Sequence, residues 1–315
     1  MQSTPIKNGA SDKDNKTEGR HRYGLGILLI ICAVFIFSIM DALVKYLGSQ
    51  SLNSIYIIGI RFTLTFFWTL LILKPWKHPE VTRTKHLGLH LIRAACMIFA
   101  AFTVFVALKY LSMPAMTSIV FAAPLIVSIL AGYFLGEKIG PRRIVAVIIG
   151  FLGVLVVTRP GTSFFSLAAL LALLTAVLNA FYSMTTRRLS DHDRPETAFF
   201  YTALAGIIVL LPILPFFWET PDSWTIWLAL FVLSVLSTLA HGILTIAHKY
   251  APASILAPFY YAQLISAIFL SVIFFKQVPD KWTLIGGSIV VASGLYVFYR
   301  EHVRKKEKRE SQSAR

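Results

Sequence analysis

The sequence predicts an all-α membrane protein with ten transmembrane helices, arranged as two inverted five-helix repeats. Three observations lead to this fold class: an apolar composition, ten long apolar segments and a similarity between the two halves. Apolar residues make up 56% of the 315 residues and charged residues only 14%, whereas a typical soluble domain has about 45–50% and about 25%. With a mean hydropathy of +0.69, the chain has more apolar surface than a soluble globule can bury.

The chain is strongly basic, with 30 Lys and Arg against 15 Asp and Glu and a formal net charge of +15. Such a charge can indicate nucleic-acid binding, but here the cations lie between long apolar runs. No basic stripe lies on a polar helix, and no aromatic RNA-binding motif is present. Cations that flank membrane spans explain the charge better, so we expect a lipid bilayer and no nucleic acid around this chain.

Ten segments are long and apolar enough to cross a bilayer, which requires about 20 mostly apolar residues per helix. The first five are Gly24–Leu47, Ser54–Lys74, Leu87–Lys109, Met113–Leu135 and Arg143–Thr158. The second five are Ser163–Thr186, Thr197–Trp218, Ser223–Ala247, Pro252–Phe275 and Lys281–Tyr299. The links between them are mostly brief, so no soluble domain fits between the spans.

The two ends of the chain are polar. We expect residues 1–22 to form a disordered cytoplasmic tail, because they are hydrophilic and of mixed charge. Residues 301–315 form a second, charged cytoplasmic tail. The first apolar segment is longer than the core of a signal peptide and is followed by no small-residue cleavage site, so we interpret it as a retained helix.

The orientation follows from the distribution of Lys and Arg, which accumulate on the cytoplasmic side of membrane proteins. With a cytoplasmic N-terminus, the cytoplasmic tails and links carry 23 Lys and Arg, and the opposite side carries five. An even number of spans places the C-terminus on the same side. We therefore expect a multi-pass protein of the cell inner membrane with both termini in the cytoplasm.

The two halves resemble each other in register. Lys109–Tyr110 matches Lys249–Tyr250 at an offset of 140 residues, and the helices that follow also align. We expect one repeat over residues 23–159 and a second over residues 160–300, each with five spans. An odd number of spans inverts the second repeat, and inverted repeats are typical of secondary transporters, which hold the substrate near the midplane.

The segments Val120–Gly161 (VFAAPLIVSILAGYFLGEKIGPRRIVAVIIGFLGVLVVTRPG) and Tyr250–Glu301 carry a family resemblance. The chain resembles the drug/metabolite transporter superfamily of the EamA type, which implies a transporter with ten helices and no enzymatic activity. FSIMDALVKYLG near the start and VPDKWTLIGGSIVVASGLYVFYRE near the end resemble bacterial riboflavin and S-adenosylmethionine importers. The second repeat departs from the family pattern, with Gln277 in place of the usual Glu and Leu264 matching Pro124.

Ionisable residues inside a bilayer are costly and are therefore candidates for function. Asp41 lies ~9 Å from the outer end of the first span and Arg61 ~10 Å from the same face, at ~1.5 Å per residue. Asp41 is either a substrate or proton site, or a structural partner of Arg61. It also lies four residues before Lys45, within reach of an ion pair on one helix face.

Two further candidates lie in the third and eighth spans. Arg93, about one turn inside the third span, either extends to the interface or contacts an anionic group of the substrate. His241 binds substrate, relays protons, or hydrogen-bonds within the bundle. Two His in the eighth span do not make a zinc site, which needs three or four ligands, so we expect no metal and no cofactor.

Aromatic and amide side chains complete the candidate set. Tyr260, Tyr261 and Gln263 lie deeper in the ninth span than an interfacial belt, where they could stack on a flat ring and bond its edge. Asn179 and Tyr182 share one face of the sixth span, and Phe121 is a weaker candidate. The predicted substrate-binding residues are thus Asp41, Arg61, Arg93, Phe121, Asn179, Tyr182, His241, Tyr260, Tyr261 and Gln263.

The expected function is secondary transport of a small organic metabolite by alternating access. The chain has no phosphate-binding P-loop, and it lacks a metal-ligand cluster and a G-x-S-x-G motif, which argues against an intramembrane enzyme. Riboflavin uptake is the first expectation. S-adenosylmethionine uptake, export of amino acids or amphipathic metabolites, and a channel or structural role are the alternatives. Direction, coupling ion and homodimer formation are left open.

Overall fold

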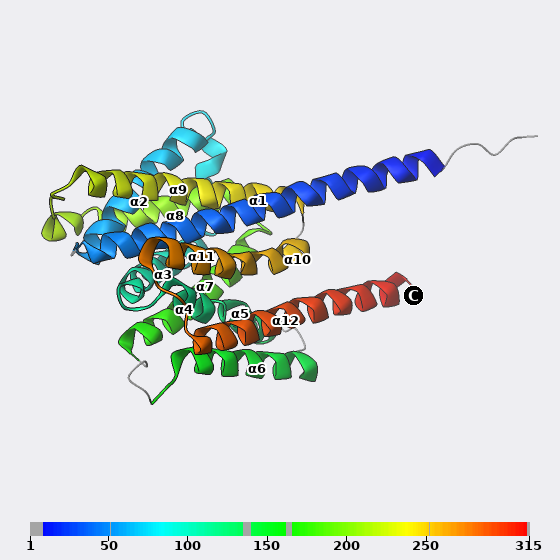
Figure 1. Cartoon of the computed structure of the whole chain (residues 1–315). Coiled ribbons are helices and arrows are strands. Elements are labelled where there is room, and N and C mark those ends of the chain that lie inside the picture. Colours follow the sequence, from blue (N-terminus) through cyan, green and yellow to red (C-terminus); the bar gives the residue numbers. More distant parts are fainter. Residues whose placement is uncertain (1–8, 51, 135–139, 162–165, 252, 314–315) are drawn as a thin grey trace, which may run out of the picture.

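The computed structural model describes residues 9–50, 52–134, 140–161, 166–251 and 253–313. Within these ranges the chain forms helices and no strand, which confirms the predicted all-α class (Figure 1). The α-helices are α1 (Gly9–Ser49), α2 (Ser54–Leu73), α3 (Leu87–Tyr110), α4 (Met113–Val120), α5 (Ala123–Phe134), α6 (Pro141–Thr158), α7 (Leu167–Leu189), α8 (Pro195–Leu210), α9 (Trp224–Tyr250), α10 (Ala253–Leu256), α11 (Ala262–Phe275) and α12 (Lys281–Ser313). Short 3₁₀ turns are η1 (Pro79–Thr82), η2 (Leu214–Phe217) and η3 (Ala257–Tyr261).

Ten helical segments correspond to the ten predicted spans. In the described part of the chain, nine are long and apolar enough to cross a membrane, and α8 is a shorter apolar helix. The predicted seventh span continued to Trp218, but α8 ends at Leu210 because Pro212 and Pro215 follow. Proline has no N–H to donate and clashes with the preceding turn. Leu135, Ser163 and Pro252, at which other predicted spans begin or end, lie outside the described residues.

The fourth and ninth spans, each predicted as a single segment, are interrupted in the structure. The break between α4 and α5 lies at Phe121 and Ala122, just before Pro124. The ninth span runs through α10, η3 and α11, and Pro258 lies within its 3₁₀ turn. Each proline removes one helical hydrogen bond, and such breaks are tolerated where the backbone is buried in protein. Phe121 and Tyr261 occupy matching places in the two breaks, 140 residues apart.

The helices pack with the symmetry of the two repeats. Helix α3 packs extensively on α7, and α1 packs extensively on α9; these two cross-repeat pairs exchange when the repeats are exchanged. Helices α2 and α8 pack together, as do α6 and α12, and each of these pairs joins equivalent helices. At the α6–α12 crossing, a Cβ added at Gly286 would lie 2.6 Å from the Gly153 carbonyl oxygen. Small residues thus allow close contact, as is common between membrane helices.

Both ends of the chain extend from one end of the bundle, which we call the termini side (Figure 1). The expected disordered tail is helical from Gly9 onward, where it continues α1. Extending an existing helix adds a hydrogen bond for each residue fixed, without a new nucleation cost. Residues 1–8 lie outside the described residues. The charged C-terminal segment likewise continues α12 to Ser313.

The outer surface of the bundle is apolar. Large side chains such as Phe67, Phe99 and Ile265 are 62%, 62% and 72% exposed. A soluble protein rarely exposes such contiguous apolar surface, whereas lipid tails cover it in a bilayer. The polar side chains described next lie between the helices instead.

Candidate substrate-binding site

A polar cavity lies between α2, α3, α7, α8 and α9, so both repeats contribute to it. Its lining consists of Arg61, Phe62, Thr65, Arg93, Met97, Tyr182, Phe199, Thr202, Ala203, Ser237 and His241. The space open to the centre of a water molecule is about 20 Å³, roughly enough for one water. Four of the ten predicted residues line this cavity: Arg61, Arg93, Tyr182 and His241.

Arg93 is the most densely bonded group of the cavity. Its Nε donates to Thr186 Oγ1 at 2.7 Å, and its Nη2 donates to Tyr182 Oη at 2.6 Å. Its Nη1 donates to the Ala198 carbonyl at 2.7 Å and to Thr202 Oγ1 at 2.5 Å. The side chain is buried, so the expectation that it extends to the interface is wrong. Arg93 instead joins α3 to α7 and α8.

Arg61 is buried with far fewer partners. Its Nη2 donates to Ser237 Oγ of α9 at 3.1 Å, and its guanidinium lies 5.5 Å from the ring centre of Phe62. Among the described residues, no ion pair joins a carboxylate to Arg61 or to Arg93. Within the described residues Ser237 is the one acceptor of an Arg61 hydrogen bond, so most of its five N–H donors have no acceptor there, and its side chain lines the cavity.

Asp41 lies beside the cavity rather than in its lining. Its Oδ2 accepts a hydrogen bond from Gln263 Nε2 at 3.4 Å. Arg61 acts on it electrostatically from beyond contact distance, so the ion pair considered for these two residues is not formed. Lys45 does not pair with Asp41 either, because its Nζ donates to the Leu108 and Leu111 carbonyls at 3.0 and 2.7 Å. These bonds cap the end of α3.

Two buried polar atoms of the lining have no hydrogen-bond partner within the described chain: His241 Nε2 and Thr65 Oγ1. The His241 ring contacts the edge of Phe37 at 5.1 Å and lies 6.4 Å from Phe199, and neither ring offers a conventional partner. Buried polar groups are nearly always bonded. These two atoms are therefore positions at which a bound molecule can supply the missing partner.

The aromatic residues of the ninth span are not part of the described lining, although Tyr260 lies close enough to the lining residue Tyr182 to interact with it electrostatically. The Tyr261 ring contacts Phe121 edge-on at 4.9 Å, so the two helix breaks meet. Its hydroxyl packs against α12, where a Cβ added at Gly294 would lie 1.7 Å from Tyr261 Oη. Tyr260 packs beside Ile30 at the contact of α1 and α9. Like these residues, Asn179 of α7 and Gln263 of α11 are not part of the lining.

Sequence reasoning missed the Ser and Thr hydroxyl groups of the lining. Thr202 and Ser237 accept hydrogen bonds from the arginines, and Thr65 lines the cavity without a partner among the described residues. Single Ser and Thr residues are common in membrane helices. A usable signal exists on α9, where Ser234, Ser237, Thr238 and His241 are spaced as one helix face. That spacing predicts a polar stripe facing the bundle interior.

Comparisons with known proteins agree with this architecture. The model of the EamA-like transporter family matches residues 24–159 and 166–299. A protein of Vibrio cholerae named riboflavin transporter is 29% identical, with 92% of this chain and 98% of that protein covered. A Rickettsia felis protein named S-adenosylmethionine uptake transporter is 29% identical with the same coverage. A pseudopaline exporter of Pseudomonas aeruginosa is 29% identical over 85% of this chain and 94% of its own length.

A solved crystal structure shares the fold, with a TM-score of 0.61, 18% identity, and coverage of 87% of this chain and 96% of the other. At this identity the likeness concerns the fold alone. The family match spans both halves of the chain, and the relatives are named as transporters. This chain therefore belongs to the EamA-like transporter family, as a multi-pass inner-membrane transporter of a small metabolite and not an enzyme.

Proposed function

We propose that this protein imports riboflavin across the inner membrane by alternating access, with the vitamin bound in the polar cavity. In this proposal the termini side faces the cytoplasm, in agreement with the excess of Lys and Arg in its tails and links. The relative named riboflavin transporter supports the substrate, but the S-adenosylmethionine relatives are equally similar. The chemistry of the cavity must therefore decide between them.

The charge of the cavity favours riboflavin over S-adenosylmethionine. Arg61 and Arg93 are both buried there, and no Asp or Glu is among the described residues of the lining. S-adenosylmethionine carries a sulfonium, an ammonium and a carboxylate, so its net charge is positive and two buried guanidinium groups repel it. Riboflavin is neutral, and its ring presents carbonyl oxygens and ring nitrogens as acceptors. The free N–H donors of Arg61 fit such acceptors.

The remaining lining suits a flat ring with a polyol tail. Phe62, Tyr182, Phe199 and His241 border the cavity and can contact an aromatic ring by stacking or edge-on. The unpartnered Thr65 Oγ1 and His241 Nε2 can bond hydroxyl groups of the tail. Aromatic side chains combined with placed polar groups are typical of small-molecule sites.

The cavity is too small for riboflavin in this arrangement, since ligand pockets measure about 300–1,000 Å³ and this space is about 20 Å³. Binding therefore requires the surrounding helices to separate. The breaks between α4 and α5 and within α10, η3 and α11 supply points at which the two repeats can bend relative to each other. Phe121 and Tyr261 meet between these breaks.

The test is uptake of labelled riboflavin by cells that cannot synthesise it, with and without this protein. The expected result is saturable uptake that excess S-adenosylmethionine does not reduce. Arg61→Gln is expected to lower the apparent affinity by about tenfold or more, the effect of losing one hydrogen bond to a charged group. Arg83→Gln, at an exposed position outside the spans, is the matched control and is expected to leave uptake unchanged.

Three outcomes would contradict the proposal. Uptake of labelled S-adenosylmethionine, without riboflavin uptake, would assign the protein to the other group of relatives. Loss of riboflavin from preloaded cells would indicate export. Normal riboflavin uptake by the Arg61→Gln protein would remove the cavity as the binding site.

A further inference from the structure

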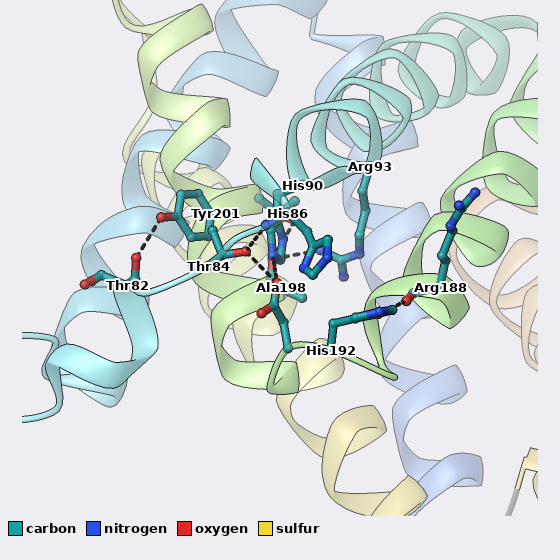
Figure 2. Close-up of polar contacts among 11 residues, drawn as sticks. Thr82, Thr84, His86, His90, Arg93, Arg188, His192, Ala198 and Tyr201 are labelled. Atoms are coloured by element: carbon teal, nitrogen blue, oxygen red, sulfur yellow. Dashed lines mark hydrogen bonds and ion pairs between the residues drawn. The ribbon is translucent and has the colours of Figure 1, made fainter. Parts of the chain in front are cut away.

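A cluster of histidines lies on the termini side, outside the substrate cavity. It joins the segment that leads into α3 to the link between α7 and α8 (Figure 2). Its members are His86, His90, His192 and Asp193. His90 and Arg93 are three residues apart on α3, so the cluster lies about one turn from the arginine that joins α3 to α7 and α8.

The centre of the cluster is a buried pair. His90 Nε2 and Asp193 Oδ2 are 2.8 Å apart, and their side chains are 0% and 10% exposed. Thr84 Oγ1 donates to the same Oδ2 at 2.6 Å, and the backbone N–H of His86 donates to Thr84 Oγ1 at 2.9 Å. Tyr201 of α8 stacks on the His90 ring at 4.9 Å. The α7–α8 link is thereby fastened to the start of α3.

Two imidazole nitrogens of the cluster are available to accept a proton. The Nδ1 atoms of His86 and His90 are buried, and neither has a hydrogen-bond partner among the described residues. The rings of His86 and His192 are 4.4 Å apart, so two charged rings at this place would repel each other. The Asp193 carboxylate thus lies near the imidazoles of His90 and His86, which favours a single added proton.

Asp193 itself stays ionised. Burial alone would raise the pKa of this carboxyl, but hydrogen bonds from Thr84 and His90 and the nearby charges of His90 and His86 hold it below its usual range. A proton taken up by the cluster therefore resides on an imidazole. The other charged or titratable groups around the pair are Arg93 of α3, Arg188 of α7, Arg194 of the link, Glu80 of η1 and Tyr201 of α8.

We propose that this cluster is a proton-binding site that controls the termini-side opening of the cavity. A proton on the imidazoles converts the His90–Asp193 hydrogen bond into an ion pair and fastens the α7–α8 link more firmly to α3. An ion pair is stronger than the hydrogen bond of a neutral imidazole, and attraction to the adjacent carboxylate outweighs the cost of one buried N–H. The closed arrangement is therefore favoured in acid and weakens as the pH rises.

The cluster and Arg93 act on the same helices. Arg93 joins α3 to Thr186 of α7 and Thr202 of α8, and the His90–Asp193 pair joins α3 to the link between those helices. Separation of α3 from α7 and α8 breaks both sets of bonds at once. Release of the proton lowers the cost of that separation, whichever metabolite the cavity holds.

The test measures opening without any substrate, so its outcome is independent of the riboflavin proposal. Cys32 and Cys96 are replaced by Ser, and Met97→Cys places a single thiol in the cavity lining. A membrane-impermeant thiol reagent is applied from the termini side of membrane vesicles between about pH 5.5 and about pH 8, the range in which histidine titrates. At each pH, the labelling rate of the protein that also carries His90→Gln is divided by the rate of the protein with His90 intact. This ratio cancels the effect of the ionisation of the thiol on its own reactivity.

The expected ratio, variant over intact, rises about fivefold to tenfold from the alkaline to the acid end, the usual gain of a charged over a neutral hydrogen bond. Asp193→Asn, which removes the charge and keeps the size of the side chain, is expected to give the same dependence and carries the test if His90→Gln fails to reach the membrane. His248→Gln, at an exposed histidine near the end of α9, is the control and should give a constant ratio near one. A ratio independent of pH for His90→Gln and Asp193→Asn would overturn the proposal.

Discussion

The two buried arginines of the cavity differ in how their bonding capacity is used. Arg93 donates to four protein acceptors on α7 and α8, whereas Arg61 donates to one, on α9. Both come from the first repeat, and their acceptors come from the second. A saturated arginine holds helices together, and an unsaturated one has donors left for a ligand. Equal burial in a bilayer therefore does not mean equal roles.

The largest expected effect is on Arg93. Arg93→Met keeps the length of the side chain and leaves Tyr182, Thr186 and Thr202 without their donor. Hydrogen bonds to charged groups contribute about 1.5–3 kcal/mol each, so we expect a loss of stability of about 3 kcal/mol or more. The measurement is the thermal unfolding midpoint of the purified protein in detergent. An unfolding midpoint equal to that of the unchanged protein would contradict the structural role that distinguishes Arg93 from Arg61.

The next effect is on Arg61, and it is expected to fall on binding instead of stability. Arg61→Met removes one bond to Ser237 and the free donors of the cavity. We expect the apparent affinity for riboflavin to fall by about tenfold or more while the unfolding midpoint changes little. A transport assay measures the apparent affinity for riboflavin, and thermal unfolding of the same protein measures its stability. The two measurements together separate an effect on binding from an effect on stability. A large drop in the midpoint with normal affinity would reverse the assignment.

Thr65→Val sharpens the same distinction on a smaller scale. The Thr65 hydroxyl has no partner in the described structure, so an apolar replacement of the same shape should leave the empty protein as stable or slightly more stable. Its loss should weaken substrate binding by about fivefold, because one neutral hydrogen bond contributes about 1 kcal/mol. Thr69→Val, whose hydroxyl donates to the Thr65 carbonyl, is the control that should not affect binding. An unchanged affinity for Thr65→Val would place the substrate elsewhere.

The smallest expected effect concerns Asp41. It accepts one long hydrogen bond from Gln263 and lies outside the cavity lining, so Asp41→Asn should preserve the riboflavin affinity to within about threefold, less than one neutral hydrogen bond. If Asp41 binds the coupling proton, the same change should abolish accumulation driven by a pH gradient while leaving exchange of substrate intact. Normal gradient-driven accumulation by Asp41→Asn would exclude a proton site at this residue.

Much of the fold follows from the sequence, because a bilayer demands apolar helices of a set length. The hydropathy pattern located the ten spans, and the Lys-Tyr register located the repeat. The pattern did not reveal where helices stop short. Pro212 and Pro215 end α8 early, and Pro124 and Pro258 accompany interruptions of the fourth and ninth spans. Whether a proline bends or breaks a helix depends on neighbours that accept the freed backbone groups.

The candidate site was predicted in part. The cost of burying ionisable groups identified Arg61, Arg93 and His241, and all three line the cavity. Tyr260 and Tyr261 were singled out by their depth in the ninth span, but Tyr261 packs against Phe121 and α12, and Tyr260 packs against the apolar cluster around Ile30. Their positions depend on the packing of α1 and α12 against the break, which the sequence pattern does not encode.

The measurement that tests the central claim most directly is binding of riboflavin to the purified protein, monitored by the quenching of flavin fluorescence. The account predicts saturable quenching by the unchanged protein, no displacement by excess S-adenosylmethionine, and a right-shifted curve for Arg61→Met. The account would be contradicted if excess S-adenosylmethionine reversed the quenching, or if Arg61→Met left the binding curve unchanged. Either result would mean that the free donors of Arg61 do not hold riboflavin.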